Sequence, residues 1–316
     1  MTELPVGHDE DEDGDALSES EKTRARDCFF ELLEVGAATL PGYIQRLDAA
    51  SEKTKQALLD AGKTERQAIG AVNQYRGMWF EMIVVHDWFR VVEVTTPTRE
   101  DPLVAIPMPK RTELRLESLW VDPIHELVLA LECDLQSHKT VMRASNPDLI
   151  LLRASVLQRH CPSVWSAART ASSIQKRHEA LDQIAHQLKG KLDYPELAGM
   201  MSLKTSLRVD RKVQPLQEAN RIKTLRKYIR TRIWQRHDSP FGFYVVLMEE
   251  SRGRTHSGSP EAFYSNVLLY SIVSIDEKPS PAVDGVLRIT SLGGLEAAIN
   301  MVHAHMREPS DRPEAP

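Results

Sequence analysis

Apolar residues recur at every third or fourth position along the first part of the chain. From Leu17 to about Trp88, residues such as Phe29, Leu33 and Ile83 follow this spacing, which is typical of amphipathic helices. Between Phe89 and Val121 the pattern changes to short apolar segments separated by prolines, namely FRVVEV, PLVAIPM and LRLESLWV. This pattern favours strands.

The second half of the chain mixes both patterns. Asp148–Leu152 and Ala198–Leu207 are continuous apolar runs of the kind found in buried central strands. Further elements are expected as helices at 124–135, 164–190, 216–236 and 292–306, and as strands at 241–248 and 267–275. Strands interleaved with helices predict an α/β fold, with a mixed central sheet flanked by helices and a helical N-terminal region.

Length and composition favour one large domain. The chain has 316 residues, 41% of them apolar, which is enough for a sizeable core. Residues 1–15 are rich in acids and are expected to form a disordered tail. We expect a single domain over 16–308, helical to about 88 and strand-rich over about 89–308, followed by a frayed tail over 309–316.

Cysteine usage and the N-terminus bear on the compartment. The three cysteines, Cys28, Cys133 and Cys161, show no paired spacing, so neither a disulfide framework nor a zinc site is predicted. There is no signal-peptide pattern and no apolar stretch near the roughly 20 residues that a membrane helix needs. These features predict a cytoplasmic protein.

Positive charge is concentrated in one part of the chain. The net charge is −5, yet residues 204–236 contain eleven Lys or Arg and only two acidic residues. A local basic surface is what phosphate binding needs, whatever the overall charge. The alternative is an ordinary solvated face of an amphipathic helix.

Three charged residues within or beside apolar segments suggest phosphodiester hydrolysis. Asp148 opens one predicted central strand, Lys204 lies in the other, and Glu218 lies on the helix that follows. Carboxylates bind Mg²⁺, which can activate a water, and a lysine can stabilise developing negative charge. Taken singly, Asp148 is also compatible with a residue in a turn or a helix cap, and Lys204 is also compatible with a residue of an edge strand.

The spacing of these residues resembles that of the PD-(D/E)XK nucleases. It is most similar to the type II restriction endonucleases that cut palindromes with a CCGG core. Fifty-five residues separate Asp148 from Lys204, Ser202 lies two positions before the lysine, and thirteen residues separate Lys204 from Glu218. The resemblance extends to the words SLR-x-DR and QPL-x-EAN.

The resemblance implies roles for the acidic residues. It makes Asp148 and Glu218 ligands of Mg²⁺ and gives Ser202 a part in orienting the site. Upstream, Asn73, Gly77 and Glu81 match a helix motif of the family, which implies that Glu81 is a further catalytic residue and metal ligand. The alternative is a helix-surface glutamate.

The resemblance also implies residues that contact DNA. Arg208, Asp210 and Arg211 match the family's Arg-x-Asp-Arg element, although its frequent proline is Val209 here. Arginine donates to guanine O6 and N7, and a carboxylate accepts from cytosine N4, so this set suits a CC/GG half-site. The neighbouring Lys212, Arg221 and Lys223 are expected to contact the DNA backbone. The alternative is a surface cluster of salt bridges.

These observations together predict a Mg²⁺-dependent type II restriction endonuclease. It is expected to cut double-stranded DNA at a CCGG-containing palindrome, as a homodimer or homotetramer, with a cognate methyltransferase as genetic partner. Two alternatives stay open. One is another nuclease of the same superfamily, in repair or transposition, and the other is a non-catalytic DNA-binding protein.

Overall fold

The computed structural model describes residues 29–30, 33, 42–95, 101–139, 146–205, 209–234, 240–248, 268–269 and 280–306, with the side chains of 94–95, 209–212, 268–269 and 280 excepted. The predicted tails at 1–15 and 309–316 lie outside these residues. Within the described part of the chain, no helix combines the length and apolar character that crossing a membrane would require.

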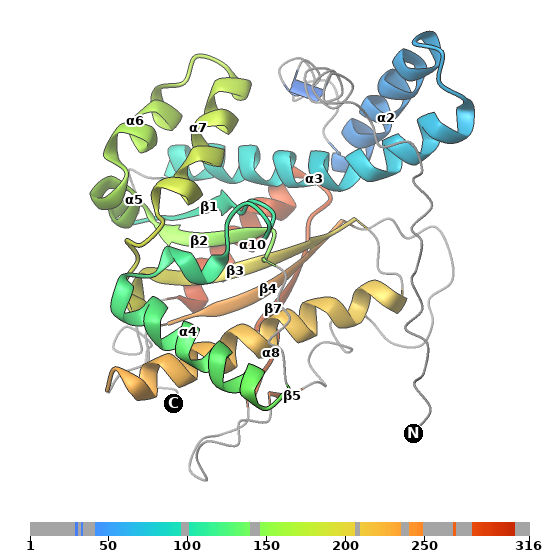
Figure 1. The fold of residues 1–316 in the computed structure, drawn as a ribbon. Helices are drawn as coiled ribbons and strands as arrows, with labels where there is room; N and C mark the ends of the chain where they lie inside the picture. The colour runs from blue at the N-terminus through green and yellow to red at the C-terminus, as the bar shows by residue number, and fades with distance from the viewer. Residues whose placement is uncertain are drawn as a thin grey trace, which may run out of the picture.

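A five-stranded mixed sheet forms the centre of the molecule (Figure 1). Its strands, in spatial order, are β1 (Leu103–Pro107), β2 (Leu149–Arg153), β3 (Leu197–Lys204), β4 (Gly242–Leu247) and β7 (Gly285–Arg288). The pairs β1–β2 and β2–β3 are antiparallel, whereas β3–β4 and β4–β7 are parallel. A second, two-stranded sheet pairs β5 (Leu268–Leu269) with β6 (Ser280–Pro281).

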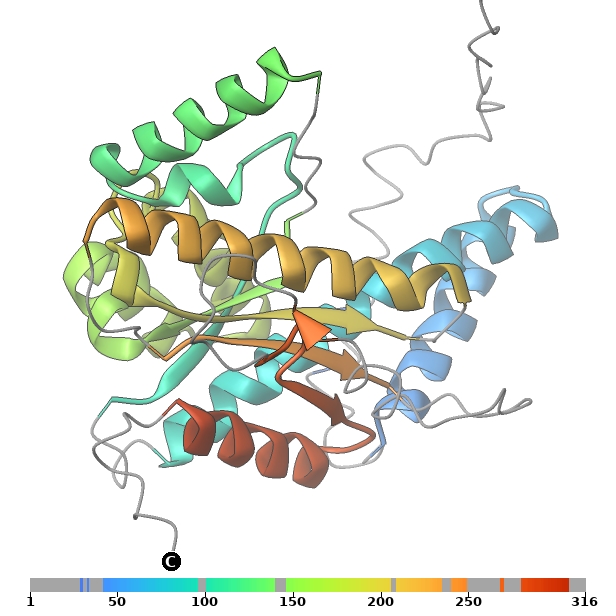
Figure 2. The same ribbon diagram turned by 90° about the horizontal axis from the view of Figure 1, so that it is seen from below.

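Helices cover both faces of the main sheet (Figure 2). On one face lie α3 (Glu65–Thr95) and α10 (Leu292–His305), and on the other lie α4 (Asp122–Ser137) and α8 (Val209–Arg232). Between residues 42 and 205, the described helices also include α2 (Tyr43–Asp60), α5 (Ala154–His160), α6 (Pro162–Thr170), α7 (Ile174–Gln187) and the 3-10 turns η2 (Leu116–Leu119) and η3 (Tyr194–Glu196). The predicted α/β class and mixed central sheet are therefore confirmed.

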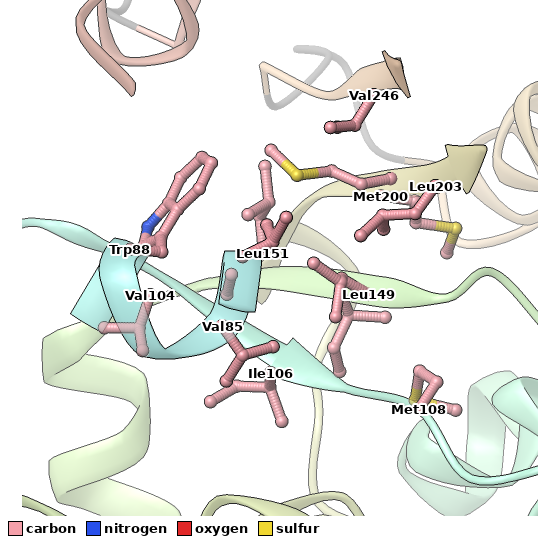
Figure 3. Close-up of a cluster of buried hydrophobic side chains, with 14 of the residues drawn as sticks. Val85, Trp88, Val104, Ile106, Met108, Leu149, Leu151, Met200, Leu203 and Val246 are labelled. Atoms are coloured by element: carbon pink, nitrogen blue, oxygen red, sulfur yellow. The ribbon is translucent and has the colours of Figure 1, made fainter. Parts of the chain in front are cut away.

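The apolar core lies between α3 and the strands. Figure 3 shows Val85 and Trp88 of α3 against side chains of β1, β2 and β3. All residues of β1, β3 and β4 are buried, which explains why the sequence shows continuous apolar runs there rather than alternation. The indole of Trp88 also donates a hydrogen bond to the carbonyl of Leu103, at 2.9 Å, which ties α3 to the start of β1.

Two predicted strands were wrong. The segment FRVVEV belongs to the last turns of α3, where Phe89 and Val92 lie on its buried face. The segment LRLESLWV contains the turn η2, with Glu117 buried between apolar neighbours. Both segments are rich in residues that favour strands, but burial against the sheet decides the conformation of such residues.

Helix boundaries differ from the prediction in two places, and helix α5 and strands β6 and β7 were not predicted. The helix expected over 164–190 is interrupted at Ala171 between α6 and α7. Helix α8 begins at Val209 and contains Pro215, whereas the prediction began it at 216. The short edge strand β7 has only one fully buried residue, Leu287, so its four residues form no extended apolar run in the sequence. The strand expected over 267–275 is described only at Leu268–Leu269.

Candidate active site

Asp148 and Lys204 meet at one end of the central sheet. Asp148 immediately precedes β2 and Lys204 ends β3, and these strands run antiparallel, so both residues lie at the same end. The ammonium nitrogen of Lys204 is 3.8 Å from Oδ2 of Asp148. The backbone of Asp148 is fixed as well, since its carbonyl accepts a 3.0 Å hydrogen bond from the N–H of Met108, which follows β1.

The carboxylate of Asp148 is held by β3. Its Oδ2 accepts hydrogen bonds from the backbone N–H of Leu203 and, at 3.4 Å, from the hydroxyl of Ser202. Burial raises the pKa of Asp148, whereas Lys204 and both hydrogen bonds lower it, and the charge of Glu218 raises it. The balance is a pKa above the ordinary value. Ser202 is itself completely buried, and Asp148 is the partner of its hydroxyl.

Glu218 lies on the buried face of α8. Its neighbours on that face are Ala219, Ile222 and Leu225, which pack into the core. An acid in this apolar stripe points towards the sheet rather than to solvent. One oxygen of Glu218 accepts a 2.8 Å hydrogen bond from the amide of Gln214, one turn earlier. The charge of Glu218 also contributes to the raised pKa of Asp148, after burial as the main cause.

Glu81 belongs to the helix on the opposite face of the sheet to Glu218 (Figure 2), and the charge of Asp148 acts on it. It lies on α3, where burial raises its pKa well above the ordinary value, and the charges of Asp148 and Asp182 raise it further. Asp182, on α7, was not predicted as a site residue. It lies one turn beyond His178, which contacts the carbonyl of Met82 at 3.0 Å. Nothing in the sequence distinguishes Asp182 from an ordinary helix-surface acid.

The donor chemistry of this site suits Mg²⁺. Among the described residues, no group of three His, Cys, Asp or Glu side chains is arranged to hold a metal ion. However, Mg²⁺ is usually bound by one or two carboxylates and keeps several waters or takes substrate phosphates. Asp148 and Glu218 offer two such carboxylates, and a bound cation would offset the effect of the charge of Glu218 on Asp148.

The structure places the predicted DNA-reading residues only in part. Arg208 lies outside the described residues. Asp210, Arg211 and Lys212 belong to the first turn of α8, so their backbone is helical rather than a loop, while their side chains are not described. Because α8 begins five residues after Lys204, this turn lies next to the end of the sheet where Asp148 and Lys204 meet.

The basic stretch after Lys204 is not one solvent-facing surface. Arg226 is buried between the rings of Tyr194 and Phe241, with its guanidinium carbon 4.3 and 4.4 Å from their centroids. Lys223 forms an ion pair with Asp284, with 2.7 Å between Nζ and Oδ2, and donates to the carbonyl of Pro281. The charge run therefore includes cations that attach α8 to the sheet.

Lys223→Met is expected to lower the free energy of unfolding by about 3 kcal/mol, because it leaves the carboxylate of Asp284 buried with its ion-pair partner removed. The two side chains are only 11% and 12% exposed. Urea denaturation measures this loss. The exposed Lys189 supplies the control, since Lys189→Met is expected to change stability by less than about 0.5 kcal/mol. Unchanged stability of Lys223→Met, combined with weaker binding to every DNA sequence, would instead support a phosphate contact.

Comparison with known proteins assigns the family. A family model described as Cfr10I/Bse634I restriction endonuclease matches residues 19–303. The type II restriction enzyme Cfr10I of Citrobacter freundii is 22% identical over 237 residues, covering 74% of this chain and 78% of the relative.

Solved structures show the same fold. Bse634I restriction endonuclease superposes with a TM-score of 0.65 at 23% identity, covering 84% of this chain and 87% of that one. A structure of the Type IIF restriction endonuclease Bse634I with cognate DNA gives a TM-score of 0.62 at 21% identity, covering 83% and 86%. The fold is thus of the PD-(D/E)XK type. Since the family model spans most of the sequence, the chain belongs to the Cfr10I/Bse634I family of restriction endonucleases and is a type II site-specific deoxyribonuclease.

Proposed function

We propose that this enzyme cuts double-stranded DNA at a palindrome with a CCGG core, by Mg²⁺-dependent hydrolysis. The observation that supports the catalytic part is the approach of Lys204 to Asp148 at one end of the sheet, with the charge of the buried Glu218 acting on Asp148. Two carboxylates and a lysine in one partly buried site are the donor set that metal-assisted phosphodiester hydrolysis uses.

Each residue of the site has a distinct role in this proposal. Asp148 and Glu218 hold the metal, with Glu81 as a further ligand from α3. When bound, Mg²⁺ supplies a Lewis acid for the phosphoryl oxygen and lowers the pKa of a water. Lys204 places its ammonium where negative charge develops on the phosphate. Ser202 and the N–H of Leu203 fix the rotamer of Asp148.

The specificity part of the proposal concerns Arg208, Asp210 and Arg211. The two guanidinium groups would each donate to O6 and N7 of a guanine, and the carboxylate would accept from the amino groups of the cytosines. Lys212 and Arg221 would contact phosphates. Support comes from the spacing of these residues from Lys204 and from the relative solved with cognate DNA.

The palindrome requires a symmetric assembly. One chain reads one half-site, so two chains related by a two-fold axis read the complete CCGG core. We propose a homodimer or a homotetramer, acting in the cytoplasm, with a methyltransferase of the same specificity protecting the host DNA. Light scattering on the purified enzyme, with and without a CCGG duplex, distinguishes dimer from tetramer.

Digestion of plasmid DNA tests the proposal directly. With Mg²⁺ we expect discrete fragments whose sequenced ends share CCGG, and with EDTA we expect none. Premethylated plasmid identifies the protected cytosine. Discrete fragments with another sequence at their ends would overturn the CCGG assignment alone. Unspecific degradation would favour a different nuclease role, and DNA binding without any cleavage would contradict the catalytic proposal.

Glu81→Gln is expected to slow cleavage and, in metal-free buffer, to raise thermal stability at alkaline pH. An acid whose pKa is raised in the folded state stabilises the fold only while protonated, and this contribution is lost as the pH rises through the raised pKa. Glutamine does not ionise, so the variant does not lose stability as the pH rises. Thermal melts at about pH 8 and about pH 4.5 measure the difference, which should vanish at the lower pH.

Glu93→Gln provides the matched control for Glu81. Glu93 lies three turns further along α3 and its side chain is 37% exposed, at 3.8 Å from Arg177. We expect no change in cleavage rate for this control. If Glu81→Gln cleaves DNA at the wild-type rate, Glu81 is an ordinary helix glutamate without a role in the site.

A further inference from the structure

Asn146 is a partly buried side chain two residues before Asp148, and the proposed mechanism assigns it no part. Its amide nitrogen donates hydrogen bonds to the carbonyls of Pro109 and Leu114, at 2.8 and 2.6 Å, and its oxygen accepts from the N–H of Leu116 at 3.2 Å. Among side chains of this size, only an amide supplies two donors and an acceptor together. The side chain therefore closes the loop that joins β1 to η2.

The loop that Asn146 closes is itself fixed. Within it, the N–H of Leu114 donates to the carbonyl of Lys110 at 3.0 Å, and the side chain of Leu114 is buried in the core. Arg111 of the same loop donates to both carboxylate oxygens of Glu117, in η2, at 3.0 Å each. The three hydrogen bonds of Asn146 thus attach the start of β2 to a rigid support.

The chain between Asn146 and Asp148 is stiff. Pro147 lies between them and is buried. A proline ring fixes its own φ at about −65° and restricts the residue before it to extended conformations. The backbone of Asp148 is also held by the N–H of Met108, which donates to its carbonyl at 3.0 Å. A displacement of Asn146 therefore displaces the start of β2, where the carboxylate of Asp148 lies beside Lys204.

We infer that Asn146 is a positioning residue for the active site, which acts through Asp148. Its side chain holds the start of β2 against the loop after β1, so that the carboxylate of Asp148 stays with its hydrogen-bond donors on β3 and beside Lys204. A misplacement of about 1 Å at a reacting group can cost on the order of 100-fold in rate. The inference rests on the proposed role of Asp148 in metal-dependent cleavage, and it adds a residue outside the proposed catalytic and DNA-binding sets.

Asn146→Ala tests the inference, because it removes all three hydrogen bonds to the loop. Mn²⁺ binding is measured by calorimetry on the protein bound to a duplex with a non-cleavable linkage. We expect the affinity for Mn²⁺ to fall roughly 10- to 100-fold, as for other residues that orient a metal ligand. Single-turnover cleavage in Mg²⁺ should fall in the same range, while the affinity for the specific duplex in EDTA stays unchanged. A general loss of folded protein would lower duplex binding and cleavage together.

Asp101→Ala is the matched control, because Asp101 connects the same two strands at their other end. Its carboxylate accepts hydrogen bonds from the N–H of Ser155 at 2.9 Å and from the hydroxyl of Ser155 at 2.7 Å. These bonds join the segment before β1 to α5, which follows β2. The control thus removes a comparable polar connection far from Asp148, and it should leave Mn²⁺ affinity and cleavage unchanged.

Three outcomes would overturn the inference. They are wild-type Mn²⁺ affinity in folded Asn146→Ala, an equal loss in Asp101→Ala, and a loss of duplex binding as large as the loss of cleavage. If Asn146→Ala does not fold, Asn146→Ser decides, since its shorter side chain cannot reach all three partners. It should weaken Mn²⁺ binding by a smaller factor, and wild-type affinity would count against us. The proposed function fails independently, if Asp148→Ala binds Mn²⁺ and cleaves DNA like the wild type.

Discussion

Asp148→Ala is expected to reduce the rate of DNA cleavage by more than about 100-fold. A loss of about 100-fold is the largest that is typical when a residue that only supports a metal ligand is mutated. A larger loss of cleavage rate therefore identifies Asp148 as a ligand. Binding of the specific duplex should persist or tighten, because a carboxylate close to the phosphates is removed. Single-turnover cleavage in Mg²⁺ and a binding titration in EDTA measure the two effects separately.

Asp148→Asn separates charge from hydrogen bonding at the same position. The asparagine oxygen can still accept from the N–H of Leu203 and from Ser202, so the local structure should persist. If cleavage depends on metal binding, the asparagine variant should be nearly as inactive as the alanine variant. The exposed Asp122, in the first turn of α4, serves as control, and Asp122→Ala should cleave normally. Near wild-type cleavage by Asp148→Asn would remove Asp148 from the catalytic set.

The sequence pointed to this end of the sheet as the candidate catalytic site because three charged residues break an apolar pattern. Asp148, Lys204 and Glu218 are charged residues beside or within buried runs, and a buried charge needs a partner. The structure brings Asp148 and Lys204 together across two antiparallel strands, and Ser202 joins them through a hydrogen bond. Such signals come from local burial, which the pattern of apolar residues reveals.

The roles of the basic residues on α8 could not be predicted in this way. Lys223 and Arg226 occupy the charge run that suggested a phosphate-binding face, yet their partners come from segments remote in sequence, such as Asp284 and the ring of Tyr194. Long cationic side chains can bury their stems and pair within the structure, so charge density alone does not indicate exposure. The buried ion pair of Glu117 with Arg111 was not predicted either, because Glu117 lies in a segment predicted as a strand.

Asp210→Asn is expected to impair binding to CCGG duplexes while improving binding to unrelated sequences. A carboxylate near DNA is repelled by phosphates everywhere, and only the amino groups of cytosines compensate for that repulsion. Losing one such contact should cost roughly 1–3 kcal/mol of discrimination. Asp210 lies in the first turn of α8, close to the end of the sheet where Lys204 lies. In the proposal, one chain therefore contacts a base through Asp210 and the phosphate that is cut through Lys204.

Lys212→Ala is the control for Asp210→Asn, because Lys212 lies in the same helical turn but is proposed to contact a phosphate rather than a base. Its loss should weaken binding to all duplexes alike and reduce the slope of log affinity against log salt by about one. Competition binding with CCGG and scrambled duplexes across a salt series measures both variants. A uniform gain on all duplexes by Asp210→Asn would show that this carboxylate touches no base. The CC/GG half-site would then have to be read by Arg208 and Arg211 alone, through the guanines.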